Sequence, residues 1–206
     1  MSLTIQISTR RDFKNSELNE MHRLRAKIFG ERKGWEVQID KGMEIDGFDA
    51  VNPHYMMMRE PGGVLRGCWR LLTTEGPYML KNTFPQLLHG SLPPRDPKIW
   101  ELSRFAIETR AQSTFGFSEI AIRSIGQILI YGRQAGIEQY VTVTTTAVER
   151  MLLKAGVSIK RIGPPMMIGI EKAVAIYVNI RESVNSMKSL YAIRNLLSFG
   201  EYVPAD

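Results

Sequence analysis

The length, composition and charge of the chain narrow the class of protein before any motif is considered. Its 206 residues are 44% hydrophobic, which favours one compact domain over two small ones. The single cysteine, Cys68, excludes an internal disulfide. No apolar run reaches the about 20 residues of a membrane span, so we expect none. The N-terminus lacks signal-peptide features, so we expect a cytoplasmic protein. The net charge of +6 would suit nucleic acid, but basic runs with interleaved aromatic residues are missing, so we expect no nucleic-acid partner.

A first helix of about four turns is predicted to begin at Asn15, where Asn-Ser-Glu forms a helix-start signal. Along this helix Met21, Arg25 and Phe29 recur at i, i+4 and i+8, so Arg25 lies on the apolar stripe rather than on the polar face. A guanidinium group that is always charged needs a partner there. The sequence therefore predicts an ion pair between Arg25 and a nearby carboxylate.

The segment after this helix is acidic, although the protein as a whole is basic. Residues 34–60 hold six acidic and two basic residues, and the polar stretch from Gly30 to Gly47 is expected to be an ordered loop. Either Asp46 or Asp49 can supply the partner of Arg25. A purely structural ion pair is an equally weighted alternative to a functional one.

The next two strands carry buried or partly buried cations. Residues 55–59 and 64–73 are predicted to form a hairpin in which Arg66, Cys68 and Arg70 share one face. Because apolar residues flank Arg70 in sequence, we expect this arginine to be a semi-buried cation.

A further strand is predicted over residues 100–107. Its alternation places Glu101 and Phe105 on one face and Arg104 on the other. A bulge would bring Glu101 and Arg104 into one site, whereas a regular strand would leave two unrelated surface charges.

The rest of the chain alternates helices and strands. We predict a helix over residues 117–135, a strand over 137–146, a helix over 147–155, and a strand over 173–180 followed by a C-terminal helix. This order predicts a mixed sheet with helices on both faces, the α/β class.

Searches for metal and phosphate motifs find nothing. There is no Walker A loop and no zinc-type spacing of cysteine and histidine, and His22, His54 and His89 lie in no metal or catalytic-triad pattern. We expect no metal site and no cofactor.

Five segments together form a specific pattern. They are Arg25-x3-Phe29-x5-Trp35, Glu44-Ile-Asp46-Gly-Phe-Asp49, Gly67-Cys-Trp-Arg70, Asn82-Thr-Phe84-Pro and Trp100-Glu101-Leu-Ser-Arg104-Phe-Ala-Ile. In combination, order and spacing over residues 1–180 they resemble the LuxI-type acyl-homoserine-lactone synthases. Thr142-Val-Thr-Thr145 and the run from Gly76 to Phe84 are similar to the branch that includes the Pseudomonas enzyme making a long-chain 3-oxo signal.

The resemblance implies a fold and a reaction. The fold would be a GNAT-like acyltransferase α/β/α sandwich with a mixed, splayed central sheet, in one synthase domain over residues 1–206. The reaction would take an acyl chain from an acylated acyl carrier protein and the homoserine moiety from S-adenosylmethionine, which is a substrate rather than a cofactor. The products would be an N-acyl-homoserine lactone used as a quorum-sensing signal, methylthioadenosine and the free carrier protein.

The chemistry of these substrates assigns roles as hypotheses. Glu101 would deprotonate the attacking amine, directly or through water. A sulfonium substrate that also carries a carboxylate suits a site with acidic and basic groups, and the predicted catalytic and substrate-binding cluster is Arg25, Asp46, Asp49, Arg70 and Arg104. Phe29 and Trp35 are expected to close over the adenosyl group, and Phe84 is expected to bind S-adenosylmethionine or to line the acyl slot.

An apolar slot for the acyl chain and a basic face for the acidic carrier protein are also expected. The predicted slot is lined by Met79, Trp100, Leu102, Phe105, Thr142, Val143, Thr144 and Met151, with ordinary core packing as the alternative for each apolar residue. By resemblance, Thr144 stands where a hydroxyl accompanies 3-oxo chains. The predicted docking residues are Arg150, Lys154, Lys160, Arg161 and Lys172, with scattered solvating charge as the alternative.

Two rival functions remain open from the sequence. The first is a GNAT-like N-acyltransferase that uses acyl-coenzyme A, although no convincing copy of its Gln/Arg-x-x-Gly-x-Gly/Ala loop lies near residues 110–119. The second is a non-enzymatic, basic binding module.

Overall fold

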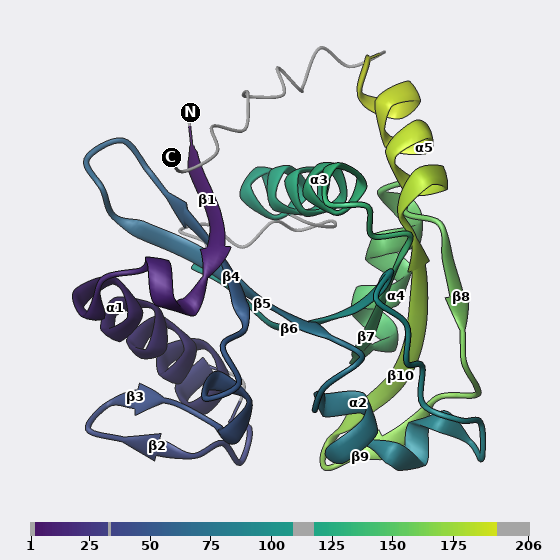
Figure 1. The fold of residues 1–206 in the computed structure, drawn as a ribbon, viewed down its shortest axis with the longest axis horizontal. Coiled ribbons are helices and arrows are strands. Elements are labelled where there is room, and N and C mark those ends of the chain that lie inside the picture. The colour runs from purple at the N-terminus through teal and green to yellow at the C-terminus, as the bar shows by residue number, and fades with distance from the viewer. Residues whose placement is uncertain (1–2, 33, 109–117, 193–206) are drawn as a thin grey trace. The chain divides into compact units, whose positions relative to one another are not determined.

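The computed structural model describes residues 3–32, 34–108 and 118–192, and the chain divides into two units (Figure 1). Of the described residues, unit 1 holds 3–71 and 104–108, and unit 2 holds 72–103 and 118–192. The single domain over residues 1–206 stays a prediction.

Unit 1 contains an antiparallel sheet covered by one helix. Its strands are β1 (Thr4–Thr9), β4 (His54–Arg59), β5 (Leu65–Thr73, of which the last residues belong to unit 2), the end of β6 (Ile99–Ile107), and a separate hairpin of β2 (Ile39–Asp40) and β3 (Met43–Glu44). Its helical elements are α1 (Asn15–Arg25), the π-helix Ala26–Arg32 and the 3₁₀ turns Arg10–Asp12 and Gly47–Asp49. β1 pairs with β4 and β4 with β5, both antiparallel.

The core of unit 1 forms where α1 packs on this sheet. Met21, Leu24 and Ile28 recur at helical spacing and are all buried in one cluster with Tyr55 of β4 and Cys68 of β5. The predicted first helix is confirmed, but its final turns are π-helical. The prediction of an ordered segment after it is also confirmed, because the β2–β3 hairpin and the Gly47–Asp49 turn give that segment regular structure.

Unit 2 is built on a mixed sheet. Its helical elements are α2 (Met79–Asn82), the 3₁₀ turn Pro85–Leu88, α3 (Glu119–Gln134), α4 (Thr146–Lys154) and α5 (Ile180–Ala192), and its strands besides the start of β6 are β7 (Gln139–Thr145), β8 (Ile159–Arg161), β9 (Met166–Ile168) and β10 (Glu171–Asn179). β6 pairs with β7 in parallel, and β10 pairs with β7, β8 and β9 in antiparallel. α3 packs against α5.

The sheet of unit 2 is splayed between β6 and β7. Their paired register covers only Ile99–Glu101 and Gln139–Val141, although within unit 2 β6 continues to Ser103 and β7 to Thr145. The predicted mixed sheet is therefore confirmed, while β8 and β9 were not predicted. Most of residues 110–119, where the sequence shows no convincing coenzyme A loop, lie outside the described part of the chain.

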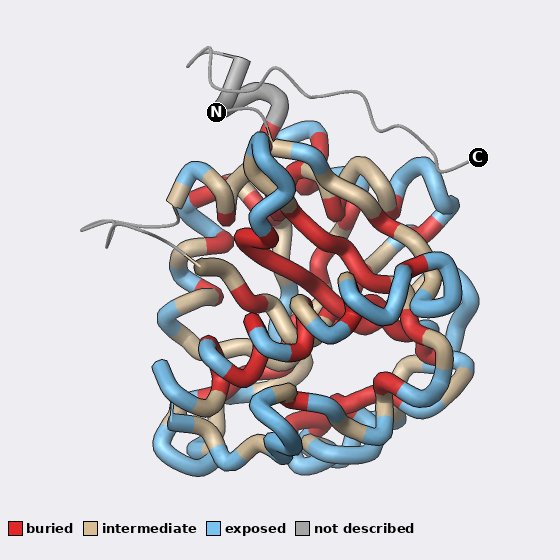
Figure 2. Tube along the Cα trace, turned by 90° about the vertical axis from the view of Figure 1, so that its left-hand side faces the viewer, coloured by how far each residue is buried: buried red, intermediate tan, exposed pale blue. Residues whose placement is uncertain are grey.

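Burial explains why the charged residues of β5 need partners. Every residue from Leu65 to Leu72 is buried, so neither face of this strand is open to water. Figure 2 shows the buried parts of the chain in red. Arg70 is 0% exposed, and the prediction that it is only semi-buried was wrong because both faces of the strand are covered. A guanidinium group in this position needs carboxylates within hydrogen-bond distance.

Candidate active site

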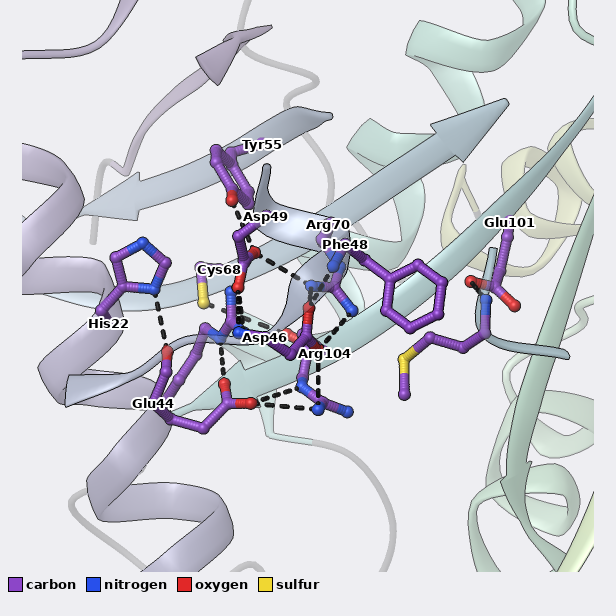
Figure 3. A network of polar contacts seen from close by, with 12 residues as sticks. His22, Glu44, Asp46, Phe48, Asp49, Tyr55, Cys68, Arg70, Glu101 and Arg104 are labelled. Atoms are coloured by element: carbon purple, nitrogen blue, oxygen red, sulfur yellow. Dashed lines mark hydrogen bonds and ion pairs between the residues drawn. The ribbon is translucent and has the colours of Figure 1, made fainter. Parts of the chain in front are cut away.

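Asp49 is the centre of a buried ion cluster in unit 1 (Figure 3). Its Oδ1 accepts hydrogen bonds from Arg25 Nη1 at 2.8 Å, Arg70 Nη1 at 2.9 Å and Tyr55 Oη at 2.6 Å. Its Oδ2 accepts from Arg25 Nη2 at 3.0 Å and from the Asp46 backbone N–H at 2.9 Å. Burial alone would raise the pKa of Asp49, but Arg25 and Arg70 hold that pKa well below its usual range. The predicted pairing of Arg25 with Asp49 is confirmed.

Two further carboxylates complete the cluster. Asp46 accepts from Arg70 Nη1 at 2.5 Å and from Arg104 Nη2 at 2.9 Å. Glu44, which is 1% exposed, accepts from Arg25 Nε at 2.5 Å and from Arg104 Nε at 3.0 Å. Three arginines and three carboxylates thus balance in charge, and each arginine contacts two carboxylates.

The rings of Phe29 and Phe48 each lie near one guanidinium group of the cluster, and Trp35 stacks on Phe29. The rings of Phe29 and Trp35 stack with centroids 5.3 Å apart and planes 7° apart. The Arg104 guanidinium lies 5.6 Å from the Phe29 centroid, and the Arg70 guanidinium lies 5.5 Å from the Phe48 centroid. The predicted catalytic and S-adenosylmethionine-binding residues of unit 1 therefore lie in one connected group of contacts: Arg25, Phe29, Trp35, Asp46, Asp49, Arg70 and Arg104.

Arg104 owes its orientation to an unusual backbone conformation. Its φ is +54°, in the left-handed region that a strand residue other than glycine rarely adopts. Strict alternation along β6 is broken at this residue, and its side chain meets Glu44 and Asp46. The predicted bulge that would bring Glu101 and Arg104 into one site stays a prediction, since the two residues belong to different units.

We expect Arg104→Gly to be about 1 kcal/mol more stable than Arg104→Ala. Both variants lose the same ion pairs, so their difference isolates the strain of a left-handed φ, which glycine adopts freely. Urea unfolding measures both variants. At Ser103, whose φ is not positive, the order should be reversed, and alanine favoured over glycine at both positions would contradict the prediction. Neither Arg104 variant should form lactone.

His22 and Tyr55 form an uncharged layer around the cluster. His22 Nδ1 donates to the Glu44 backbone carbonyl oxygen at 2.9 Å, and its ring meets the Tyr55 ring edge-on with centroids 6.4 Å apart. Burial, and secondly the charge of Arg25, lower the pKa of His22. The histidine is therefore neutral at pH 7.

This lowered pKa predicts a loss of stability in mild acid. Below pH 6.5 the unfolded chain protonates His22 while the folded protein does not, so the free energy of unfolding falls as pH decreases from that point. His22→Asn keeps an N–H donor but cannot titrate. Between pH 6.5 and 5, the unfolding free energy of the variant should depend less steeply on pH than that of the wild-type protein. The difference in slope should correspond to at most one proton taken up on unfolding. Urea titrations at several pH values measure both slopes, and identical slopes would refute the assignment.

Glu101 lies in unit 2, where its carboxylate holds the start of α2. Its Oε2 accepts from the Met79 backbone N–H at 2.8 Å and its Oε1 from that of Leu80 at 2.7 Å. The side chain is 1% exposed. Glu101 thus caps a one-turn helix whose own N-cap residue, Tyr78, makes no side-chain cap.

The predicted acyl-slot residues are distributed over both units. Met79 and Leu102 are buried in unit 2, and Phe105 belongs to unit 1, where it stacks on Trp69 with centroids 4.1 Å apart. The remaining residues predicted for the slot or the adenosyl group are half-buried members of unit 2: Phe84, Trp100, Thr142, Val143, Thr144 and Met151. A cavity of about 380 Å³ in unit 2 is lined by other residues, Gln139, Ser158, Ile159, Lys160, Tyr177, Asn179 and Glu182.

The predicted docking residues are exposed but not equivalent. Arg150 and Lys154 of α4 and Lys172 of β10 are exposed, as is Lys160 of β8. Arg161 donates through Nε and Nη2 to both carboxylate oxygens of Glu149, at 2.5 and 2.6 Å, and Glu149 is only 3% exposed. Arg161 is therefore held in a bidentate ion pair within unit 2.

Within residues 3–32, 34–108 and 118–192, no group of three histidine, cysteine or acidic residues could hold a metal ion. No helix in this described part is long and apolar enough to cross a membrane.

Comparison of the fold with solved structures first defines a class. An acyl-CoA N-acyltransferase from Pseudomonas aeruginosa matches with a TM-score of 0.59 at 12% identity, over 85% of this chain and 99% of that chain. The AHL synthase LasI matches with a TM-score of 0.83 at 44% identity, over 100% of this chain and 99% of that chain. The protein thus has the GNAT-like acyltransferase fold that its sequence predicted.

The sequence comparisons then give the family. The Autoinducer synthase family matches residues 9–188. An acyl-homoserine-lactone synthase of Pseudomonas aeruginosa is 48% identical over 180 residues, which are 86% of this chain and 90% of the relative. The chain belongs to the autoinducer synthase family and is an acyl-homoserine-lactone synthase, an acyltransferase of quorum sensing. A solved coenzyme A-dependent member of this class, BjaI with SAM and isopentyl-CoA, matches with a TM-score of 0.82 at 24% identity, over 93% of this chain and 90% of that chain.

Proposed function

We propose that the ion cluster of unit 1 binds S-adenosylmethionine and that the protein joins its homoserine moiety to an acyl chain carried by an acyl carrier protein. The observation that carries the proposal is the balanced set of three arginines and three carboxylates around Asp49. S-adenosylmethionine presents a sulfonium, an amine and a carboxylate, and a cluster holding both signs of charge offers each a counter-charge. The Phe29–Trp35 stack offers a flat surface for the adenine ring.

The first chemical step is acyl transfer to nitrogen. The neutral amine attacks the thioester carbonyl, a C–N bond forms, the C–S bond breaks, and the carrier thiolate leaves and takes up a proton. A carboxylate must remove a proton from the amine, and Glu101 has this role in the proposal, directly or through water. Its oxygens already accept the Met79 and Leu80 amides, and a carboxylate oxygen can accept more than one hydrogen bond.

The second step closes the lactone. The substrate carboxylate attacks the carbon that bears the sulfonium, an O–C bond forms, the S–C bond breaks, and methylthioadenosine leaves as a neutral thioether. Since the leaving group is already cationic sulfur, this step needs orientation of the carboxylate more than an added acid or base. Arginines of the cluster are suited to that orientation because a guanidinium fork fixes a carboxylate in two directions.

An acyl carrier protein is proposed as the donor because its acidic surface complements the exposed cations of unit 2. Arg150 and Lys154 lie one helical turn apart on α4, where both are exposed. Coenzyme A remains the alternative donor, since the related BjaI is described as coenzyme A-dependent. The proposed location is the cytoplasm, where a carrier protein would be met.

Charge reversal tests the proposed donor. The double variant Arg150→Glu, Lys154→Glu should raise KM for the acyl carrier protein about tenfold, because the substituted residues would repel its acidic surface. The matched control is Arg10→Glu, Lys14→Glu, which reverses two exposed charges in unit 1. Equal effects of the two double variants on the carrier protein would contradict the docking assignment.

Binding of labelled S-adenosylmethionine to the purified protein, measured by equilibrium dialysis, tests the proposed substrate site. Saturable binding that Asp46→Asn weakens is expected. Binding that is indifferent to Asp46, whose side chain is 17% exposed, would move the substrate elsewhere.

A further inference from the structure

Tyr55 is a fully buried phenol at the edge of the ion cluster, and no step of the proposed reaction uses it. It lies on β4 directly across from Arg70 of β5, and it is 0% exposed. Its Oη donates to Asp49 Oδ1 at 2.6 Å (Figure 3). The residue is therefore a neutral member of a site otherwise held together by charges.

The bond from Tyr55 bears on both buried arginines. Asp49 Oδ1 is also the oxygen that accepts from Arg25 Nη1 and from Arg70 Nη1. Without the phenol this oxygen would have two donors instead of three, and the carboxylate would be freer to turn about its own bond. Any such turn would displace Arg25 and Arg70 together, since both bond to the same atom.

The ring that carries this hydroxyl is held by its neighbours. The Phe13 ring lies 6.4 Å away at 59°, and the His22 ring lies 6.4 Å away at 87°. Burial, and secondly the charge of Asp49, raise the pKa of Tyr55, so the phenol keeps its proton and acts as a donor at neutral pH. The position of the phenol oxygen is thus set by the packing of the ring, and its O–H bond points to Asp49 Oδ1.

We propose that Tyr55 is a positioning residue for the S-adenosylmethionine half of the reaction, acting through Asp49 on Arg25 and Arg70 without touching substrate. The inference rests on the proposed function, in which this cluster binds S-adenosylmethionine. It assigns to Tyr55 an effect on one substrate and not on the other. A merely structural tyrosine would change thermal stability and leave both substrates alike.

The test compares two variants that each remove one buried phenol oxygen. Tyr55→Phe should lower kcat/KM for S-adenosylmethionine about tenfold, because small misplacements of binding groups are costly in rate, and should leave KM for the acyl donor unchanged. The control is Tyr140→Phe in unit 2, which removes a buried hydroxyl that donates to the Ile128 carbonyl at 2.8 Å and should change neither parameter. Both are assayed well below their melting temperatures.

Each outcome decides between positioning and packing. If Tyr55→Phe and Tyr140→Phe behave alike in kinetics, the positioning role is overturned. If Asp46→Asn also fails to affect S-adenosylmethionine, the proposed substrate site fails as well; if Asp46→Asn weakens binding and Tyr55→Phe does not, only the role of Tyr55 fails.

A measurement on the unsubstituted protein covers the case in which Tyr55→Phe does not fold. The hydrogen-bonded phenol proton of Tyr55, followed by NMR, should shift when S-adenosylmethionine is added, and that of Tyr140 should not. An unshifted Tyr55 proton at saturating substrate would overturn the proposal.

Discussion

Asp49→Asn should lower the free energy of unfolding by about 3–5 kcal/mol, the cost of breaking a buried ion pair by removing one partner. The substitution keeps the shape of the side chain but leaves Arg25 and Arg70, both 0% exposed, with one carboxylate fewer between them. An asparagine nitrogen would also face one of the donors that Asp49 now accepts. Urea unfolding, monitored by tryptophan fluorescence, measures the loss.

Glu138→Gln is the matched control for this prediction. It removes the charge of an exposed ion pair with Lys98, in which the side chains are 66% and 60% exposed, and it should leave the unfolding free energy nearly unchanged. A similar small effect from Asp49→Asn would mean that water or a rearranged Asp46 compensates for the lost charge. The cluster would then be looser than its hydrogen bonds indicate.

Glu101→Gln should lower the rate of acyl transfer by about 10²–10⁴-fold, the usual contribution of a positioned general base. Glutamine is nearly the same size and can still accept one of the two α2 amides, so most of the loss should appear in kcat rather than in folding. Single-turnover formation of the acylated intermediate over a range of pH measures it.

A second variant separates proton transfer from the anchoring of α2. Thr74 Oγ1 donates to the Ile99 carbonyl at 2.7 Å and so fixes the segment before α2. Thr74→Val should therefore loosen this segment and lower the rate only slightly. Equal losses in the two variants would assign Glu101 to positioning and contradict its role as the base.

The ion pair between Arg25 and Asp49 was predictable from the sequence, because a local pattern pointed to each residue. Arg25 on an apolar stripe demanded a carboxylate, and the acidic segment offered Asp49, which the structure confirms. Glu44 was missed as a cluster member because six acidic residues share that segment and only the β2–β3 hairpin turns this one toward Arg25 and Arg104. Its place inside a signature motif was the available signal.

Other features depended on long-range structure. Strand alternation could not predict the left-handed φ of Arg104, which turns that side chain to Glu44. Tyr55 looked like any aromatic residue of a hairpin, and only the cross-strand register with Arg70 brings it to Asp49. Arg161 read as a free surface cation because nothing in the sequence links it to Glu149 twelve residues earlier.

The fold was predicted well where elements are long. The helix predicted over residues 117–135 and the strands predicted over 100–107 and 137–146 correspond to α3, β6 and β7. Their periodic patterns extend over many residues, and these three predictions are confirmed. β8 and β9 were missed because a three-residue strand has no measurable period. The splay between β6 and β7 is a matter of register, and the sequence carries no local signal for it.

The reaction itself gives the most direct test of the account. The purified protein is incubated with S-adenosylmethionine and an acylated carrier protein, and in parallel with S-adenosylmethionine and the matching acyl-coenzyme A, and methylthioadenosine and lactone are quantified by mass spectrometry. We expect equal amounts of methylthioadenosine and N-acyl-homoserine lactone in the carrier-protein mixture. Products with coenzyme A alone would overturn the proposed donor, and no methylthioadenosine in either mixture would contradict the synthase mechanism.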